Sequence, residues 1–208
     1  MLLSVTCTRE ASQDKPPRES PSAETTAKQA APASEWTMAR AHTALRDKNL
    51  GYNWNAAFRI EDGRVTGAEL TGSDVTDISP LADINLQGLD LRGVRVSDLT
   101  PLKGLPIVDL YLEGTLVEDL SPLAGSNLER LHIGETVVTD LASIKDPRLI
   151  RLVFRPSPIT RGLNIARNMT SIQEVGTTFE NRMPPAVLGT LRPRSVPVAS
   201  GFHSRRPL

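Results

Sequence analysis

Residues that could carry out catalysis are few in this chain, and none of them form a familiar arrangement. The histidines His42, His132 and His203 lie in different regions, and no pair has the i, i+4 spacing of a helical zinc site. The single cysteine, Cys7, excludes an internal disulfide and a thiolate metal cluster within one chain. The sequence also lacks the glycine-rich loop, strand lysine and Asp-Phe-Gly motif of a kinase and the Gly-x-Ser-x-Gly elbow of a hydrolase. We therefore expect no enzymatic activity, no cofactor, and no catalytic or metal-binding residues.

Bulk charge argues against a nucleic-acid partner. The chain has 24 basic and 24 acidic residues, so no overall field draws it toward nucleic acid or an anionic membrane. No stretch approaches the roughly 18 consecutive apolar residues of a membrane-spanning helix. We expect a protein partner, no nucleic acid and no transmembrane segment.

The strongest signal is a repeat with a period of 21 residues between residues 65 and 159. Aliphatic side chains recur at this interval in four columns. The columns are Leu89, Leu110, Leu131 and Leu152; Leu70, Leu91, Leu112, Ile133 and Phe154; Val75, Val96, Val117, Val138 and Ile159; and Ile78, Leu99, Leu120 and Leu141. The Leu-x-Leu alternation marks a short strand in each unit, and stacked units would form a parallel sheet around a shared interior.

The segment after each strand has its own pattern. Ser79-Pro80, Thr100-Pro101 and Ser121-Pro122 stand at constant phase behind an aspartate. A hydroxyl N-cap followed by proline is a common opening of a short helix or 3-10 turn, so we expect short turns on the side opposite the strands. Ala142-Ser143 replaces the pair in the fourth unit, where we expect the cap to be lost.

A column of small hydroxyl residues follows the strands. Ser73, Thr115 and Thr136 are expected to hydrogen-bond loop amides between neighbouring coils. Val94 interrupts this column, and we expect a local weakness there.

A cap is predicted in front of the first repeat. Ser34 is the expected N-cap of a helix that ends before Gly51. Its expected apolar stripe consists of Trp36, Ala39, Ala44 and Leu45. Phe58 and Ile60 then alternate with Arg59, and Asp62-Gly63 signals a two-residue hairpin turn.

The chain divides into four segments. Residues 1–33 are expected to form a disordered tail or tether, 34–64 an N-terminal helix and hairpin cap, 65–178 the repeats, and 179–208 a disordered tail. The last coil is altered, because Ile172 and Val175 follow Leu149 and Leu152 by 23 residues. The start of the chain, up to Cys7, resembles the end of a bacterial lipoprotein signal, which makes Cys7 a possible lipid anchor.

The columns between residues 64 and 175 resemble the internalin-type branch of bacterial leucine-rich repeats. Residues 44–49 and 58–65 are similar to short repeat proteins found with bacterial serine/threonine kinases. Internalin-type repeats usually run 22 residues with asparagine in the loop column, and this chain differs in both. We expect an α/β solenoid: a short leucine-rich-repeat stack with parallel strands on one face and 3-10 turns on the other. The resemblance implies a role in interaction or regulation.

The face formed by the strands is the candidate partner-binding surface. Tyrosine and arginine, which are enriched at binding hot spots, occur on it among mixed charges. The candidate residues are Asp90, Arg92, Asp109, Tyr111, Glu113, Arg130, His132, Arg151 and Arg155. An exposed His132 would make binding sensitive to pH.

The predicted function is a protein–protein interaction module, in bacterial signalling. The alternative is an envelope-tethered, lipoprotein-like structural repeat protein. The sequence leaves the location open between the cytoplasm and the cell envelope.

Overall fold

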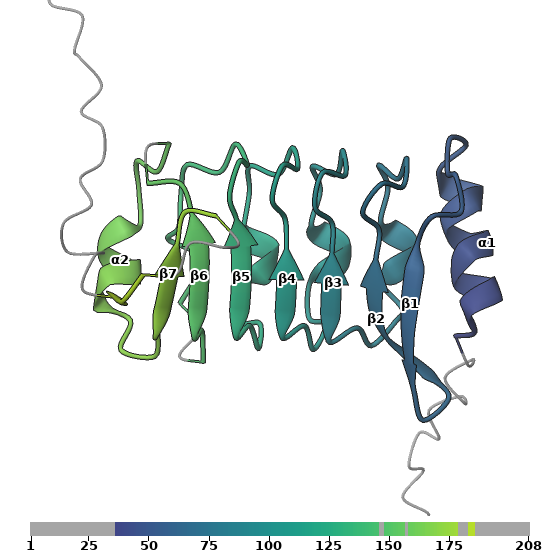
Figure 1. Cartoon of the computed structure of the whole chain (residues 1–208), viewed down its shortest axis with the longest axis horizontal. Helices are drawn as coiled ribbons and strands as arrows, with labels where there is room; N and C mark the ends of the chain where they lie inside the picture. The colour runs from purple at the N-terminus through teal and green to yellow at the C-terminus, as the bar shows by residue number, and fades with distance from the viewer. Residues whose placement is uncertain (1–35, 146–147, 157, 179–182, 186–208) are drawn as a thin grey trace, which may run out of the picture. The chain divides into compact units, whose positions relative to one another are not determined.

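The computed structural model describes residues 36–145, 148–156, 158–178 and 183–185. Seven strands in this part of the chain form one sheet in chain order (Figure 1). The strands are β1 (Ala57–Glu61), β2 (Arg64–Glu69), β3 (Gly88–Asp90), β4 (Asp109–Tyr111), β5 (Arg130–Ile133), β6 (Arg151–Phe154) and β7 (Glu174–Gly176). β1 and β2 are antiparallel, and every later neighbouring pair is parallel.

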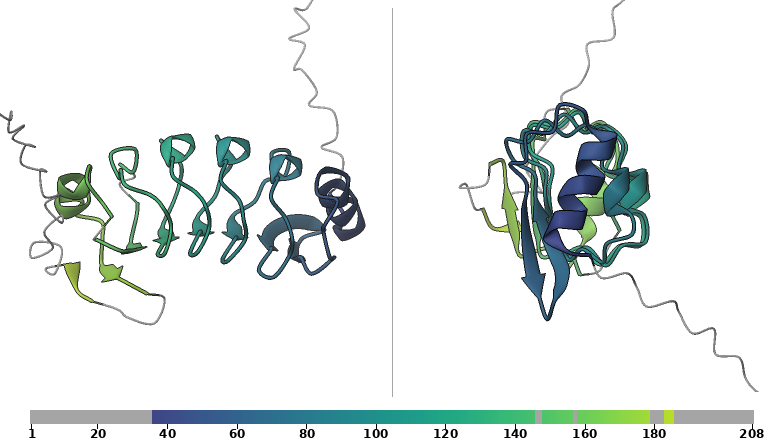
Figure 2. Two further views of the ribbon diagram at one scale, coloured as in Figure 1. Left: turned by 90° about the horizontal axis from the view of Figure 1, so that it is seen from above. Right: turned by 90° about the vertical axis from the view of Figure 1, so that its right-hand side faces the viewer.

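Short turns stand opposite the strands. The first three coils return through 3-10 helices η1 (Ser79–Leu81), η2 (Thr100–Leu102) and η3 (Ser121–Leu123), each with proline near its start. Figure 2 shows these turns on the far side of the coils from the sheet. Helix α1 (Met38–Lys48) precedes the hairpin, and helix α2 (Leu163–Asn168) lies in the last coil. The expected leucine-rich-repeat solenoid is confirmed.

The interior is built from the four predicted columns. Leu89 pairs in register with Leu110, Leu110 with Leu131, and Leu131 with Leu152. Every member of the four columns is at most 2% exposed. Burying one such side chain contributes about 1.5–3 kcal/mol, so these columns are the main source of stability. Leu152 pairs with Val175, which confirms the 23-residue step of the last coil.

An aspartate two residues before each 3-10 helix accepts from the N–H of its first residue, and this bond is here called the aspartate cap. The backbone N–H of Thr100 donates to Oδ1 of Asp98 at 2.8 Å, and that of Ser121 donates to Asp119 at 2.7 Å. The expected hydroxyl N-cap is wrong, because Ser79, Thr100 and Ser121 are already the first helical residues. In the fourth unit, where Ala142-Ser143 replaces the hydroxyl and proline pair, no 3-10 helix forms. Asp140 still accepts from the N–H of Ala142 at 2.7 Å.

The hydroxyl column stabilises individual coils and does not link neighbouring ones. Ser73, Thr115 and Thr136 each donate to the carbonyl oxygen three residues earlier, at 2.6, 2.7 and 2.8 Å. The expected bonds to amides of adjacent coils are therefore wrong. Val94 lacks the hydroxyl, but its backbone N–H still donates to the carbonyl of Leu91 at 3.0 Å. The expected weakness at Val94 stays a prediction.

Helix α1 begins later than predicted. Its N-cap is Thr37, whose Oγ1 accepts from the N–H of Arg40 at 3.2 Å. The predicted cap, Ser34, lies outside the described residues. Ala41 and Leu45 form the buried stripe, and the expected contribution of Ala39 is wrong, because it is exposed.

Asn49 joins α1 to the first coil. Its Nδ2 donates to the carbonyls of Leu45 and Asp77, both at 2.9 Å. Its Oδ1 accepts from the N–H groups of Thr76 and Asp77 at 2.8 and 2.9 Å. This buried side chain therefore ends the helix and also satisfies backbone groups of the repeat.

The hairpin forms as predicted, with one irregularity. Asp62 and Gly63 both have positive φ, as a two-residue turn of type I′ requires. The register shifts between Arg59 and Ile60. Ile60 pairs with the buried Val65 but is itself exposed.

The aspartate caps lead to a first prediction. Replacing Asp98 by alanine is expected to lower the free energy of unfolding by about 1 kcal/mol, because the N–H of Thr100 loses its acceptor. The control Thr100→Ala keeps that N–H and should cost less. Bonds from the side chain and the N–H of Thr100 hold the pKa of Asp98 below its ordinary 3.8. Its contribution is therefore present at neutral pH and is lost only in stronger acid.

Urea denaturation of the two variants at pH 7 measures this difference. A larger loss for Thr100→Ala than for Asp98→Ala would contradict the assignment of the cap to the aspartate.

Candidate partner-binding face

The outward side chains of successive strands lie in rows, because the strands pair in register. The first row holds Arg59, Gly67, Gly88, Asp109, Arg130, Arg151 and Glu174. The second row holds Glu69, Asp90, Tyr111, His132, Val153 and Gly176. Thr71, Arg92, Glu113 and Arg155 lie just beyond the strand ends.

The two ends of this face differ in exposure. Over β5 and β6 it is covered: His132 and Val153 are 0% exposed and Arg151 is 8% exposed. The residue directly after β7 reaches this side, because a Cβ on Gly134 would meet the carbonyl oxygen of Thr177 at 3.6 Å. The prediction that His132 and Arg151 are exposed is wrong. The accessible face is the part over β1 to β4, with Arg130 at its border.

Buried His132 is held as a neutral imidazole. The edge of the Tyr111 ring packs against it at 4.6 Å between centroids and 79° between planes. Burial, together with the nearby guanidinium groups of Arg151 and Arg92, lowers the pKa of His132 to about 4. The expected pH-sensitive contact with a partner is therefore wrong at this position.

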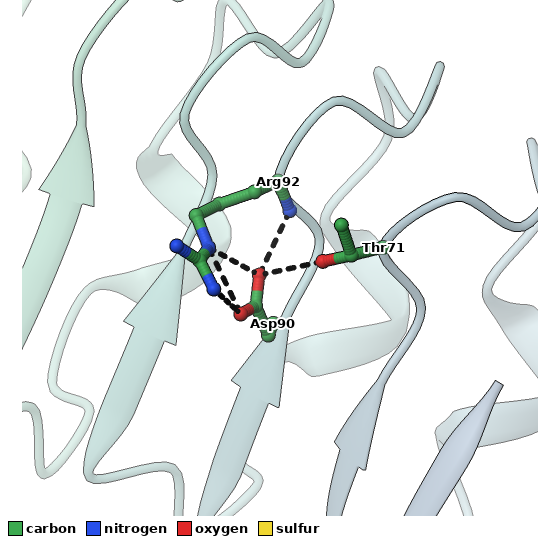
Figure 3. Close-up of polar contacts among 3 residues, drawn as sticks. All are labelled: Thr71, Asp90 and Arg92. Atoms are coloured by element: carbon green, nitrogen blue, oxygen red, sulfur yellow. Dashed lines mark hydrogen bonds and ion pairs between the residues drawn. The ribbon is translucent and has the colours of Figure 1, made fainter.

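Asp90 bonds Thr71 and fixes the guanidinium of Arg92 on the accessible face (Figure 3). Oδ1 of Asp90 accepts from Oγ1 of Thr71 at 3.3 Å and from the N–H of Arg92 at 3.0 Å. Oδ2 of Asp90 accepts from Nε and Nη2 of the same arginine at 2.9 and 2.6 Å. Arg92 also lies 5.8 Å from the centroid of the Tyr111 ring. The hydrogen bond to Asp90 raises the pKa of Arg92, so the guanidinium stays charged and oriented.

A groove of about 530 Å³ crosses the accessible face. Gly67 and Gly88 are adjacent in the first row and leave its floor without side chains. Arg59 reaches over the floor from the hairpin side, and Tyr111 and Arg130 border the groove on the repeat side. The groove is therefore a gap between charged and aromatic walls.

Asp109 lies at the repeat side of this groove. Its Oδ2 accepts from Nη1 of Arg130 at 3.1 Å. Its Oδ1 is buried and has no hydrogen-bond partner in the described part of the chain. Burial raises the pKa of Asp109 more strongly than the charge of Arg130 lowers it. This carboxylate keeps an unused acceptor beside the glycine floor.

The remaining predicted residues are separated from the groove. Glu113 is half-buried, with its side chain near Gly134. Arg155 forms an exposed ion pair with Glu135 at 2.5 Å, in the loops beyond β5 and β6. The structure thus groups Asp90, Asp109, Tyr111 and Arg130 around one groove. Arg92 is paired with Asp90 but does not line the groove.

The sequence analysis missed the groove itself. Gly88 precedes Asp109 by 21 residues, and Gly67 precedes Gly88 by the same interval. The two positions without a side chain were therefore visible in the repeat pattern. Arg59 stands at the alternate position of the predicted hairpin, on the same face.

No three His, Cys, Asp or Glu side chains among the described residues are placed to hold a metal ion. No helix in the described ranges is long and apolar enough to cross a membrane.

Comparisons with known proteins give structural neighbours alone. No protein-family model matches the sequence, and no curated protein does. One similar solved structure is an internalin (inlF) from Listeria monocytogenes, with 19% identity and a TM-score of 0.45 over 50% of this chain and 32% of that chain. Another is internalin C2 (inlC2) from the same species, with 25% identity and a TM-score of 0.42 over 55% of this chain and 62% of that one. The match spans less than two thirds of either neighbour.

The burial of His132 leads to a prediction for stability against pH. The unfolded chain protonates this histidine below its ordinary pKa of 6.5, whereas the folded chain resists protonation down to about 4. Stability is therefore lost as the pH falls through this window, by about 2 kcal/mol between pH 7 and pH 5. Replacement by valine, the residue at the same place in the next coil, should remove this loss.

Urea denaturation of the wild type and His132→Val at pH 7 and pH 5 measures the effect. His42 is present in both proteins, so any contribution from it cancels in the comparison. Equal losses in the two proteins would show that His132 is not held neutral.

Proposed function

We propose that this chain is a protein-interaction module whose partner docks on the accessible strand face over β1 to β4. The groove between Arg59 and the Tyr111–Arg130 wall is the observation that carries the proposal. It provides a concave surface with an aromatic ring and fixed charges, which are the features of binding hot spots.

The orientation of Arg92 supports a binding role. Four hydrogen bonds from its backbone and side chain to Asp90 fix the guanidinium before any partner arrives. A side chain that is already ordered loses less conformational entropy on binding than a free arginine does. Arg92 and Tyr111 together therefore offer an anchor of low entropic cost.

The finer parts of the proposal come from the sequence. A role in bacterial signalling follows from the resemblance of residues 44–49 and 58–65 to repeat proteins that accompany kinases. The alternative, an envelope-tethered repeat protein, depends on Cys7, which lies outside the described residues. Both readings use the same binding face.

The proposal predicts the effect of two substitutions on partner capture. Tyr111→Ala combined with Arg130→Glu removes the aromatic wall and reverses the neighbouring charge. We expect this variant of the full chain to capture about tenfold less partner from a lysate of the encoding organism than the wild type does. The reason is that loss of a hot-spot side chain costs more than about 1.4 kcal/mol of binding free energy. Quantitative mass spectrometry of the captured proteins is the measurement.

The matched control reverses a charge on the opposite side. Lys103 is exposed at the end of η2, so Lys103→Glu should leave capture unchanged. Thermal unfolding of each variant verifies that the fold is retained. Equal capture by the wild type and the double variant would reject the strand face as the docking surface.

A further inference from the structure

We infer that the groove accepts a basic side chain, arginine or lysine, from the protein partner, and that Arg59 occupies this position in the free chain. The inference rests on the proposed function, because it specifies the chemistry of the docked partner. Three features support it: the path of Arg59, the unused carboxylate acceptors, and the glycine floor.

Arg59 extends across the floor of the groove. It pairs in register with Gly67, and a Cβ on that glycine would lie 3.2 Å from the Cβ and 3.3 Å from the Nε of Arg59. A Cβ on Gly88, one strand further, would lie 3.3 Å from its Nη2. The guanidinium therefore lies over the two glycines and points toward Asp109, the next residue of the first row. Any larger residue at either glycine would push it away.

Arg59 stops short of a bond with that carboxylate. The described part of the chain contains no ion pair between Arg59 and Asp109, although the arginine's charge is close enough to lower the pKa of Asp109. Its one ion pair in the described residues is with Glu61, at 4.0 Å, where both side chains are more than half exposed. Such an exposed pair contributes about 0–1 kcal/mol, so little holds Arg59 in place.

The carboxylates of the groove have acceptors left for a cation. Asp90 is saturated by Arg92, and Oδ2 of Asp109 is used by Arg130. Oδ1 of Asp109 has no partner in the described residues. Glu69, which also lines the groove, is exposed and has no ion pair within the described ranges. An incoming guanidinium or ammonium group can therefore pair with the exposed Glu69. It can reach the buried Oδ1 of Asp109 only when Arg59 moves off the glycines.

An acidic partner group fits this groove less well. The fixed cations Arg92 and Arg130 already face carboxylates at 2.6 and 3.1 Å. An incoming carboxylate would have to compete with these bonds and would approach Asp109 and Glu69, where like charges repel. Exchange of one loosely held cation for another avoids both penalties.

Isotope-edited NMR of the full chain tests the inference with a defined probe. The peptide acetyl-Gly-Arg-Gly-amide is titrated while the backbone amides of Gly67, Gly88 and Asp109 are followed. We expect saturable shifts at these amides. Arg59→Ala should tighten the dissociation constant at least about threefold, because the internal competitor is gone. Asp109→Asn should weaken it at least about tenfold, because an amide oxygen carries no charge to meet the guanidinium.

Controls separate a specific site from general charge attraction. The same peptide with citrulline, which is neutral and of similar shape, should give no saturable shifts. Arg155→Ala removes an exposed arginine elsewhere on the strand side and should leave the affinity unchanged. Thermal unfolding verifies that Asp109→Asn is folded.

Four outcomes would overturn the inference. They are equal binding of the citrulline peptide, stronger binding of a glutamate peptide, no tightening in Arg59→Ala, and groove shifts that follow protein concentration instead of peptide, which would indicate a second copy. Partner capture that still depends on Tyr111 and Arg130 would leave the proposed function standing in each case. Loss of that dependence, with the peptide still bound, would reject the proposed function alone.

Discussion

The structure depends on one constraint: each coil must place its leucines directly beside those of the next. Leu89, Leu110, Leu131 and Leu152 meet this constraint at a spacing of 21 residues, and all are buried. Because side chains alternate along a strand, the register that aligns the interior also aligns the outer face. The rows of charges and glycines outside are therefore a direct consequence of the leucine columns inside.

The sequence was sufficient to predict whatever this periodicity determines. The parallel strands, the hairpin turn at Asp62 and Gly63, and the 23-residue step to Val175 were all predicted. Errors occurred where a shift of one or two residues changes a side chain's role. Asp98 and Thr100 are both good capping residues, and only the helix start decides which one accepts the N–H. The burial of His132 depends on neighbours from other coils, such as the Tyr111 ring, and the alternation along its own strand does not predict it.

The candidate site shows a different limit of sequence reasoning. Tyr111, Arg130 and Asp109 were predicted because their side chains are aromatic or charged. The groove exists because two residues carry no side chain: Gly67 and Gly88 open the space that the arginines and the tyrosine surround. Gly67 and Gly88 stand at the same position of successive repeats, so the register alone places two residues without side chains next to each other on the outer face. That signal in the sequence predicts the groove.

The energetics of Asp109 argue that this surface is shaped for more than stability. Burial raises its pKa, which means that folding disfavours the charged carboxylate despite the ion pair with Arg130. Its Oδ1 is buried without a partner in the described residues. An asparagine or serine there would fill the same row of the sheet without desolvating a charge. Residues that destabilise a fold in this way concentrate at functional sites, where a bound group supplies the missing interaction. The unfavourable burial of Asp109 and the gap beside it therefore point to the same part of the face.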